Sequence, residues 1–395
     1  MKSYLNISFI LLGLLASACF DEKDITSLQS ESFVKYFNNY TIFSATDVKQ
    51  VNGQGYALLG TVENSIGITQ ICLIRTNEYG NTVDSARYYG KEISAKAYCL
   101  QVLPDGGFAI LGSGKNPVTS KLQVYFIRTN EVGDTLWTKN ISSPGNVEAK
   151  YFEVNSQGSF IMTGYAEKSD VESQKQVWIG ALDKDGNSLY WSPKMYGAAK
   201  DDEGRHLQIL EDGSFIITGT TKSYPTGTLY SHAFILKATA TGGATIFSPL
   251  QSSADEEGNC IRAIDNENFL VIGTSSSTTS DSIILKQVNL VDYNLQTQWE
   301  KKYKGVYGQS LITEGSSIYL LGTTATGGTF TAISLIITDS NGNNPKYSTF
   351  GLGSQLSGSS FEKTSDNGFI ISGTNKHSEN SKSATLIKTR ANGSL

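Results

Sequence analysis

The stretch Asp105-Gly106-Gly107-Phe108-Ala109-Ile110-Leu111-Gly112 contains a sequence motif that recurs throughout this chain. It consists of a turn, an aromatic residue, three mostly apolar residues and a closing glycine. Tight turns favour aspartate and glycine, and strands favour aromatic and aliphatic residues, so each copy predicts a hairpin turn that leads into a strand. The closing glycines of the other copies are Gly60, Gly164, Gly219, Gly273, Gly322 and Gly373, and successive closing glycines lie 49 to 55 residues apart. Seven copies at this spacing predict a repeat architecture.

A second turn follows about twenty residues after each closing glycine. Its copies lie at 77–80, 130–133, 183–186, 241–242, 341–342 and 392–393. The fifth repeat has Val291-Asp292 there and no glycine. An apolar strand precedes most of these turns and an aromatic strand follows, so each repeat predicts four antiparallel strands. Four-stranded units of about 50 residues around a channel are the blades of a β-propeller.

The two ends of the chain predict how this propeller closes. The seventh repeat stops at Asn392-Gly393-Ser394-Leu395, where its outermost strand should begin. The segment 32–37, ahead of the first repeat, has the pattern of the outer strands at 85–89 and 298–303. We expect it to complete the last blade and to remove the exposed edge of an open array. The predicted fold is therefore an all-β, seven-bladed β-propeller over residues 32–395.

Composition agrees with this fold class. The chain has 395 residues, of which 17% are charged and 39 are glycine, whereas about a quarter of a soluble chain is usually charged. Few charges and many glycines suit short strands and tight turns better than long solvated helices. The net charge is −5, without the basic excess typical of nucleic-acid binding proteins, so that class is disfavoured.

The first nineteen residues predict an export signal. Lys2 precedes the apolar run 5–15, which is too short to remain as a transmembrane helix. The segment Leu15-Ala16-Ser17-Ala18-Cys19 resembles the lipobox of bacterial lipoproteins, in which the cysteine thiol is acylated, although Ala16 stands where that family has a larger aliphatic residue. The resemblance implies a lipid anchor at Cys19. The alternative is ordinary secretion with Cys19 unmodified.

An acidic segment, Phe20-Asp21-Glu22-Lys23-Asp24, follows the cysteine. It resembles the signal that exports lipoproteins of Bacteroidota-type bacteria through the outer membrane to the cell surface. Residues 20–31 are equally explained as a soluble tether. The expected location is the outer membrane, lipid-anchored and facing the exterior.

The cysteines beyond the signal are three, Cys72, Cys99 and Cys260, and none stands in CxxC spacing. At most one pair could form a disulfide in an exported protein. Buried free thiols are the simpler interpretation, and no zinc-binding pattern is present.

The repeats resemble those of the β-propeller repeat lipoproteins of Bacteroidota-type genomes. That family carries an Asp-Gly-Gly-aromatic turn, a Leu-Ile-Lys-Thr strand and a Gly-Asp-x-x-Trp turn, which match residues 105–108, 386–389 and 133–137. The resemblance covers residues 32–395 and implies architecture rather than activity. The segment 185–191 is more loosely similar to the tryptophan repeats of quinoprotein-like propellers, which include scaffold lipoproteins of outer-membrane assembly.

Catalytic motifs are scarce in this sequence. Its histidines, His206, His232 and His377, have no metal-ligand spacing, and there is no nucleophile elbow, P-loop or dinucleotide fingerprint. Two acidic clusters stand out, in connections that open on the usual ligand-binding face of a propeller: Asp201, Asp202 and Glu203, and Asp255, Glu256 and Glu257. They are open to three interpretations, namely a calcium site, a catalytic carboxylate pair or a solvated acidic rim. No other cofactor is expected.

Two further groups are candidates for the same face. A small residue, Ala45, Ala97, Ala149, Gly204, Gly258 or Gly358, opens the inner strand of six repeats, with Tyr307 as the exception. Two positions later the seven repeats read Asp47, Cys99, Tyr151, His206, Cys260, Gln309 and Ser360. We expect these residues at the channel mouth, where Tyr151 and His206 either hold a polar ligand or bind ordered water.

The loop 222–230 adds Tyr224 and Tyr230, which either contact a sugar or protein partner or pack between blades.

The sequence favours a non-catalytic surface lipoprotein, a monomeric propeller that binds a protein or glycan. It would serve as an accessory subunit of an outer-membrane uptake or assembly complex. The alternative is a propeller enzyme, a lyase, glycosidase or lactonase that uses the carboxylates of this face. Since propellers host many activities, fold does not decide between them.

Overall fold

Four-stranded antiparallel sheets account for most of the part of the chain that the structure, a computed structural model, describes. The described residues are 32–38, 42–51, 55–168, 174–224, 227, 229–277 and 280–395. The expected signal peptide 1–19, the acylated Cys19 and the tether 20–31 lie outside them. We number the sheets as blades 1 to 7 in chain order.

The strands of blades 1 to 3, with one short 3₁₀ turn, are β2 (Ile42–Gln50), β3 (Gly55–Glu63), β4 (Thr69–Asn77), β5 (Arg87–Tyr89), η2 (Lys91–Ile93), β6 (Lys96–Val102), β7 (Phe108–Lys115), β8 (Leu122–Thr129), β9 (Thr135–Ile141), β10 (Val147–Val154), β11 (Phe160–Glu167), β12 (Lys175–Leu182) and β13 (Lys194–Tyr196). Those of blades 4 and 5 are β14 (Asp202–Ile209), β15 (Phe215–Thr221), β16 (His232–Ala238), β17 (Ala244–Pro249), β18 (Asp255–Ala263), β19 (Asn268–Ser276), β20 (Asp281–Val291) and β21 (Asn294–Lys304). Those of blades 6 and 7 are β22 (Tyr307–Glu314), β23 (Ser317–Gly327), β24 (Phe330–Asp339), β25 (Lys346–Phe350), β26 (Leu356–Lys363), β27 (Phe369–Ser378), β28 (Ser381–Thr389) and β1 (Phe33–Phe37).

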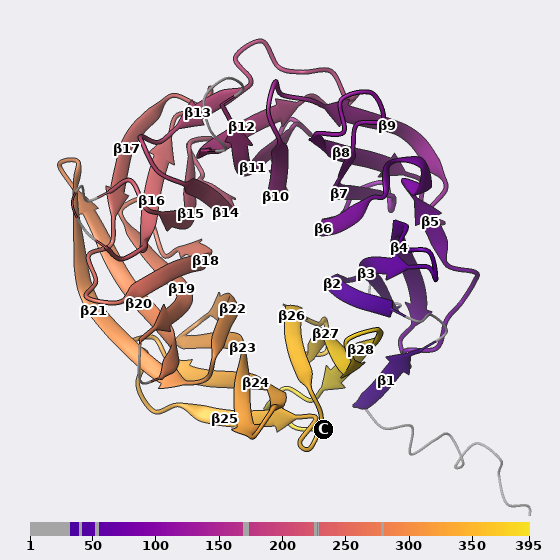
Figure 1. Ribbon diagram of the computed structural model, residues 1–395. Helices are drawn as coiled ribbons and strands as arrows, with labels where there is room; N and C mark the ends of the chain where they lie inside the picture. The colour runs from indigo at the N-terminus through magenta and orange to yellow at the C-terminus, as the bar shows by residue number, and fades with distance from the viewer. Residues whose placement is uncertain are drawn as a thin grey trace, which may run out of the picture. The chain divides into compact units, whose positions relative to one another are not determined.

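The first strand of each blade lies nearest the centre, and the fourth lies at the periphery (Figure 1). The all-β class and the repeated four-stranded sheets are thus confirmed. Within the described residues, no helix has the length and apolarity that a membrane crossing requires.

The N-terminal strand pairs as the sequence predicts. β1 runs antiparallel to β28, with Phe33 opposite Lys388 and Phe37 opposite Ala384. It therefore supplies the fourth strand of blade 7 (Figure 1). Blades 7 and 1 are also joined by one parallel pairing, Ile42 opposite Lys382.

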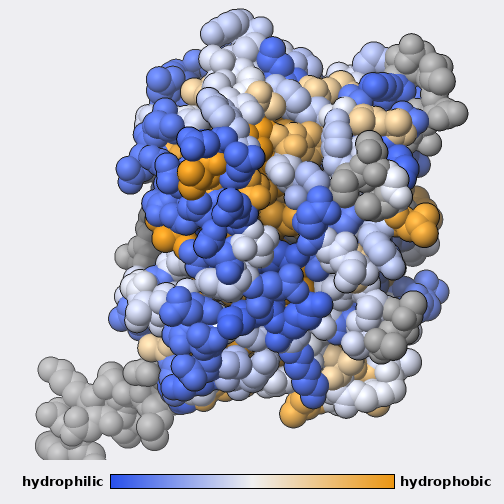
Figure 2. Space-filling view, turned by 90° about the vertical axis from the view of Figure 1, so that its left-hand side faces the viewer, coloured by the Kyte–Doolittle hydropathy of each residue, from blue (hydrophilic) through white to orange (hydrophobic). Residues whose placement is uncertain are grey.

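The hydrophobic core is divided into seven clusters, each formed between two neighbouring blades. The cluster between blades 2 and 3, for example, joins Leu111 and Phe126 to Phe152 and Met162. The cluster between blades 7 and 1 contains Leu386 with Leu58. Both faces of the inner three strands are therefore buried, which explains the low charge content. On the side of the molecule shown in Figure 2, hydrophilic residues cover much of the surface and hydrophobic areas lie between them.

Aromatic residues of outer strands pack on the turn glycines of the next blade. Gly186 of blade 3 has φ 84°, and a Cβ there would lie 3.0 Å from the Trp137 ring of blade 2. Gly80 of blade 1 has φ 74°, and its Cβ would lie 2.6 Å from the ring of Phe33. Phe33, on the fourth strand of blade 7, thus packs on a turn glycine of blade 1 in the same way as Trp137, on the fourth strand of blade 2, packs on a turn glycine of blade 3. The repeated aromatic and glycine residues are explained by this contact.

The fifth repeat forms its second hairpin without glycine. Asp292 and Tyr293, between β20 and β21, have φ of 50° and 64°. Both occupy the left-handed region that two-residue hairpin turns require.

The three cysteines of the described chain are free and buried, as the sequence predicts. Burial raises the pKa of the Cys72 thiol to about 12.

Candidate functional site

Each of the seven inner strands carries a β-bulge at the same repeat position. The register slips by one residue directly after the small residue that opens the strand, for example between Ala149 and Tyr151 in β10 and between Gly204 and His206 in β14. A bulge leaves one residue unpaired and redirects its side chain. The seven residues so placed, called the bulge residues below, are Thr46, Tyr98, Lys150, Arg205, Asn259, Gln309 and Ser359.

All seven bulge residues line one cavity of about 400 Å³, the central cavity. Its wall includes further residues from the inner strands: Asp47, Lys49, Tyr151, Glu203, His206, Glu257, Arg262, Tyr307, Ser310, Ser360 and Phe361. Every blade therefore contributes to one polar site. A volume of this size is within the range of small-molecule binding sites.

The register corrects one prediction for blade 6. Gly308, rather than Tyr307, pairs with the closing Gly322 and is the small residue of this blade. Ser310 then takes the position assigned to Gln309, which is the bulge residue instead. The reason is that the hairpin between β22 and β23 is one residue shorter than its counterparts, so counting back from the closing glycine gives the wrong residue.

Charged residues of blades 3, 4 and 5 meet at one part of the cavity wall. Glu203 lies 4.0 Å from Lys150 and 3.7 Å from Lys175. Arg205 forms an ion pair with Glu257 and donates to the Asn259 side chain at 2.7 Å. Glu203 is thus paired with two lysines of blade 3, and Glu257 is paired with an arginine of blade 4.

Glu148 stabilises the same wall from just behind it. Its side chain is buried and accepts hydrogen bonds from Tyr98 and from Tyr165 at 2.9 Å, and it lies 3.1 Å from Lys150. Burial would raise the pKa of Glu148, but Lys150 and the two tyrosine hydroxyls outweigh it and lower the pKa to about 2. The Lys150 ammonium also lies 4.3 Å from the centre of the Tyr98 ring, a cation–π contact.

Tyr151 and His206, both predicted at the channel mouth, do line the central cavity and stack on one another with ring centres 3.9 Å apart. The His206 Nε2 atom lies 3.1 Å from Nη1 of Arg262 on the next blade. Burial, followed by the charges of Arg262 and Lys49, holds the pKa of His206 well below its usual value. The imidazole is therefore neutral near pH 7.

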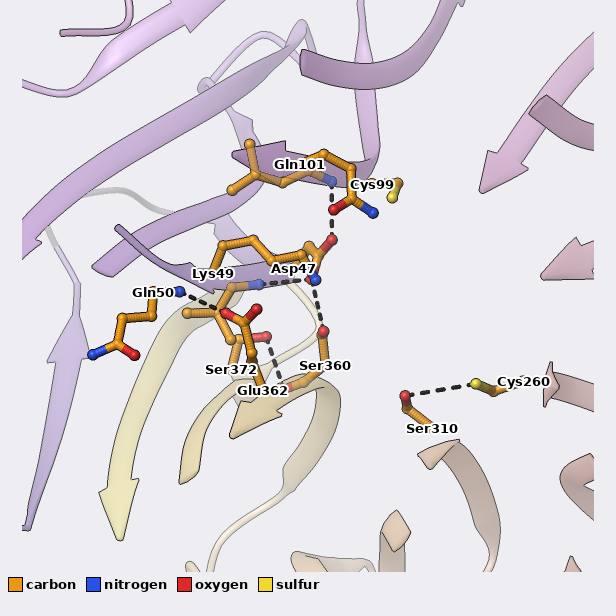
Figure 3. Close-up of polar contacts among 12 residues, drawn as sticks. Asp47, Lys49, Gln50, Cys99, Gln101, Cys260, Ser310, Ser360, Glu362 and Ser372 are labelled. Carbon is orange, nitrogen blue, oxygen red and sulfur yellow. Dashed lines mark hydrogen bonds and ion pairs between the residues drawn. The ribbon is translucent and has the colours of Figure 1, made fainter. Parts of the chain in front are cut away.

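Asp47 joins three blades at the opposite side of the wall. Its carboxylate accepts hydrogen bonds from the Ser360 hydroxyl of blade 7 at 2.6 Å and from the Leu100 N–H of blade 2 at 2.9 Å, and it lies 3.4 Å from Lys49 (Figure 3). In the same view, Ser310 of blade 6 and Cys260 of the neighbouring blade 5 form a separate contact, with the hydroxyl 3.9 Å from the sulfur.

The acidic clusters are split by the alternation of the strands. Glu203 and Glu257 reach the central cavity, whereas Asp202 and Glu256 are 0% and 1% exposed. Asp202 accepts hydrogen bonds from Thr221 at 2.5 Å, from Ser223 at 2.7 Å and from the Ala198 N–H at 3.1 Å.

Glu256 lies 2.7 Å from Lys286, which also contacts Glu300 at 3.1 Å. These contacts indicate structural roles for Asp202 and Glu256.

The outer members of the clusters cap loops of their own or a neighbouring blade. Asp201 accepts the Lys175 N–H at 3.1 Å, and Asp255 accepts the Ser231 N–H at 2.7 Å. Among the described residues, no group of three or more His, Cys, Asp or Glu side chains is arranged to hold a metal ion.

The two loop tyrosines differ. Tyr224 is half-buried and packs edge-on against Phe247, with ring centres 5.3 Å apart. Tyr230 is 44% exposed and lines a second cavity with Asp255.

The sequence analysis missed the cations Lys49, Lys150, Arg205 and Arg262 and the polar side chains of Tyr98, Asn259 and Ser359. A signal was present, because the residue after each small residue is polar in all seven repeats when blade 6 is aligned on Gly308. The bulge itself is not visible in the sequence, and the residue that it redirects was therefore, outside blade 6, not among the candidates.

Solved structures with a similar fold are β-propellers. The β-propeller domain of the Trilobed protease from Pyrococcus furiosus has a TM-score of 0.51 at 12% identity, over 90% of this chain and 96% of that one. The protein YCF48, bound to D1 peptide, has a TM-score of 0.52 at 11% identity, over 91% and 95%. An ulvan lyase bound to a saccharide of GlcA and Rha3S has a TM-score of 0.56 at 9% identity, over 90% and 96%. No protein-family model and no curated protein matches the sequence.

The chain is therefore similar to β-propellers. At these identities the likeness concerns the fold alone, and the similar folds include both enzymes and a peptide-binding protein.

Proposed function

We propose that this protein is a lipid-anchored binding module of the bacterial cell surface, whose central cavity holds a polar group of a protein or glycan partner without catalysing a reaction. The observation that carries this proposal is the lining of the central cavity by one bulge residue from each blade. Seven redirected polar side chains make a site for recognition, as in other small-molecule sites where a few polar groups fix a ligand.

The engagement of the cavity carboxylates favours binding over hydrolysis. Asp47 contacts Lys49, Glu203 contacts Lys150 and Lys175, and Glu257 contacts Arg205. Glycoside hydrolysis generally needs a pair of carboxyl groups of which one is kept protonated as a general acid. Cations beside a carboxyl group favour its charged form instead.

The proposal includes one closed ring of seven blades. Hydrogen bonds of the same kind link successive blades, and they recur between blades 7 and 1. Thr61 of blade 1 accepts the N–H of Ala97 in blade 2 at 3.0 Å, and Thr374 of blade 7 accepts the N–H of Ala45 in blade 1 at 3.0 Å. A rigid closed ring would present its cavity in a fixed geometry as a monomer.

The anchor and the location remain a proposal from the sequence. Acylation of Cys19 and export through the acidic segment 20–24 would place the propeller outside the outer membrane as an accessory subunit of an uptake or assembly complex. Metabolic labelling with a palmitate analogue should mark the wild-type chain and leave Cys19→Ser unlabelled and in the soluble fraction. Equal membrane retention of both chains would contradict the anchor.

The binding function is tested by co-purification of the full chain from native membranes. We expect the wild-type chain to be recovered with a partner in stoichiometric amounts. The double variant Glu203→Gln, Glu257→Gln removes two charges from the cavity wall without changing the size of the side chains, and we expect it to be recovered without the partner. The matched control is Glu92→Gln, in the exposed η2 turn. Recovery of the chain alone under mild detergent would contradict an accessory subunit.

The enzymatic alternative is addressed with the same variants. Turnover of surface glycans or lactones by the wild-type chain, lost in the double variant, would replace the binding function by catalysis. Asp202 and Glu256 are unsuited to this test because both are buried and bonded to their own surroundings.

A further inference from the structure

One cation of the central cavity differs from the others in its surroundings. Lys49, Lys150 and Arg205 each lie within ion-pair distance of a carboxylate. Arg262 forms no ion pair with any carboxylate of the described chain. Its Nη1 atom donates to the Ile261 carbonyl at 3.2 Å and to His206 at 3.1 Å. Arg262 is half-buried at the cavity wall, and a cation that lacks a close counterion favours an added anion more than the paired cations do.

His206 fixes the orientation of this guanidinium. Because arginine only donates hydrogen bonds, the His206 Nε2 atom must accept, and the ring proton sits on Nδ1. The ring is in turn held by stacking on Tyr151 and is only 6% exposed. The guanidinium is thus positioned from one side and faces the central cavity that it lines.

One carboxylate, Glu153, acts on Arg262 through its charge and is itself hydrogen-bonded. Glu153, on the inner strand β10, contributes to the charge environment of Arg262 but accepts the Ile209 N–H at 2.8 Å. Burial raises the pKa of Glu153. The hydrogen bond from Ile209 partly opposes this rise, and no ion pair joins Glu153 to Arg262 among the described residues.

We propose that Arg262 binds the oxyanion group of a small polar ligand in the central cavity, with His206 as a positioning residue. The ligand class is a carboxylate-, phosphate- or sulfate-bearing molecule, since the planar guanidinium matches such groups with two parallel hydrogen bonds. Gln309, which also lines the cavity, supplies a donor and an acceptor for a neighbouring hydroxyl. This inference rests on the proposed binding function and names the chemistry of its ligand.

The test measures binding of three probes to the purified full chain by calorimetry: D-glucuronate, inorganic phosphate and the neutral methyl glucoside. We expect both anions to bind and the neutral sugar to bind at least about tenfold more weakly, because a hydrogen bond to a charged group is lost. Glucuronate binding much tighter than phosphate would identify an acidic sugar as the source of the oxyanion. Equal binding would identify the oxyanion itself as the determinant.

Variants then locate the site. Arg262→Gln should weaken the binding of both anions about tenfold or more, whereas Arg390→Gln removes the same charge at the exposed C-terminal turn and should leave it unchanged. His206→Phe keeps an aromatic ring for Tyr151 but loses the acceptor, so it should weaken binding, and His206→Gln should restore part of it. If Arg262→Gln does not fold, the His206 variants decide, because weaker anion binding in His206→Phe with partial recovery in His206→Gln still places the site at Arg262.

The inference would be overturned if methyl glucoside bound as well as glucuronate, or if the wild type and Arg262→Gln had equal anion affinity. Absence of binding by either anion at millimolar concentration would overturn it as well. The proposed function fails separately, since a chain that binds anions through Arg262 yet is recovered without a partner contradicts only the accessory-subunit role.

Discussion

The carboxylate of Asp47 accepts a 2.6 Å hydrogen bond from the hydroxyl of Ser360, although the two residues stand 313 positions apart. The same carboxylate accepts the Leu100 N–H at 2.9 Å and so joins blades 7, 1 and 2 beside the central cavity. The side chain is only 7% exposed.

Asp47 should therefore contribute strongly to stability. Asp47→Ala leaves the Leu100 N–H and the Ser360 hydroxyl without their acceptor, and we expect the free energy of unfolding to fall by about 1–3 kcal/mol. Chemical unfolding followed by circular dichroism measures this. The control Asp281→Ala, at the exposed start of β20, should change it little. Equal stability of the two variants would contradict this role for Asp47.

β1 should be needed for stability. Its five residues pair with β28, and Phe33 packs on Gly80. A chain lacking residues 32–38 exposes the edge of β28, and we expect its melting temperature to fall by about 5 °C or more. Differential scanning calorimetry is the measurement, and a chain lacking residues 24–30 is the length-matched control. An unchanged melting temperature would argue against ring closure through β1.

Lys286, in the middle of β20, should be sensitive to loss of its charge. It is 1% exposed between Glu256 and Glu300, and Glu256 is equally buried. Lys286→Met leaves a buried carboxylate without its cation, which should cost about 3–5 kcal/mol of unfolding free energy.

The matched variant is Lys388→Met, whose partner Asp366 has a side chain 55% exposed to water. Its cost should be about 1 kcal/mol, since a solvated carboxylate keeps its charge. Similar losses in denaturant titrations of both variants would show that the burial of Glu256 is not decisive.

Glu148 should make the stability pH-dependent in acid. Its pKa is about 2 in the folded protein, against 4.5 for the ordinary group. A depressed carboxyl pKa stabilises the fold above the unfolded value, and this contribution is lost as the pH falls from about 4.5 towards 2. We expect Glu148→Gln to be less stable at pH 7 and to lose less stability between pH 5 and 2.5 than the wild type. Parallel pH profiles of melting temperature would contradict this assignment.

How far the sequence predicted the fold depends on local chemistry. A turn glycine such as Gly186 and an aromatic such as Trp137 are each required by one contact that recurs in several blades, so their spacing was readable without a structure. The pairing of 32–37 with the last repeat was predictable for the same reason, because Phe33 has the place of an outer-strand aromatic.

The site was predictable only in part. Of the candidate residues, Tyr151, His206, Glu203 and Glu257 line the central cavity, whereas Asp202 and Glu256, one residue away from cavity residues, are buried. Strand alternation separates such neighbours, and the bulge shifts that alternation by one residue. Neither the alternation at these positions nor the bulge can be predicted from the identity of a single residue.

The sequence by itself determined the repeat, the number of strands in each unit and the role of the N-terminal segment, because these depend on turns and contacts that recur every 50 residues or so. Only the tertiary structure decided which polar side chains meet around the central cavity. The partners Arg262 and His206, or Asp47 and Ser360, come from different blades, and their contact depends on the register of each inner strand and on the packing of one blade against the next.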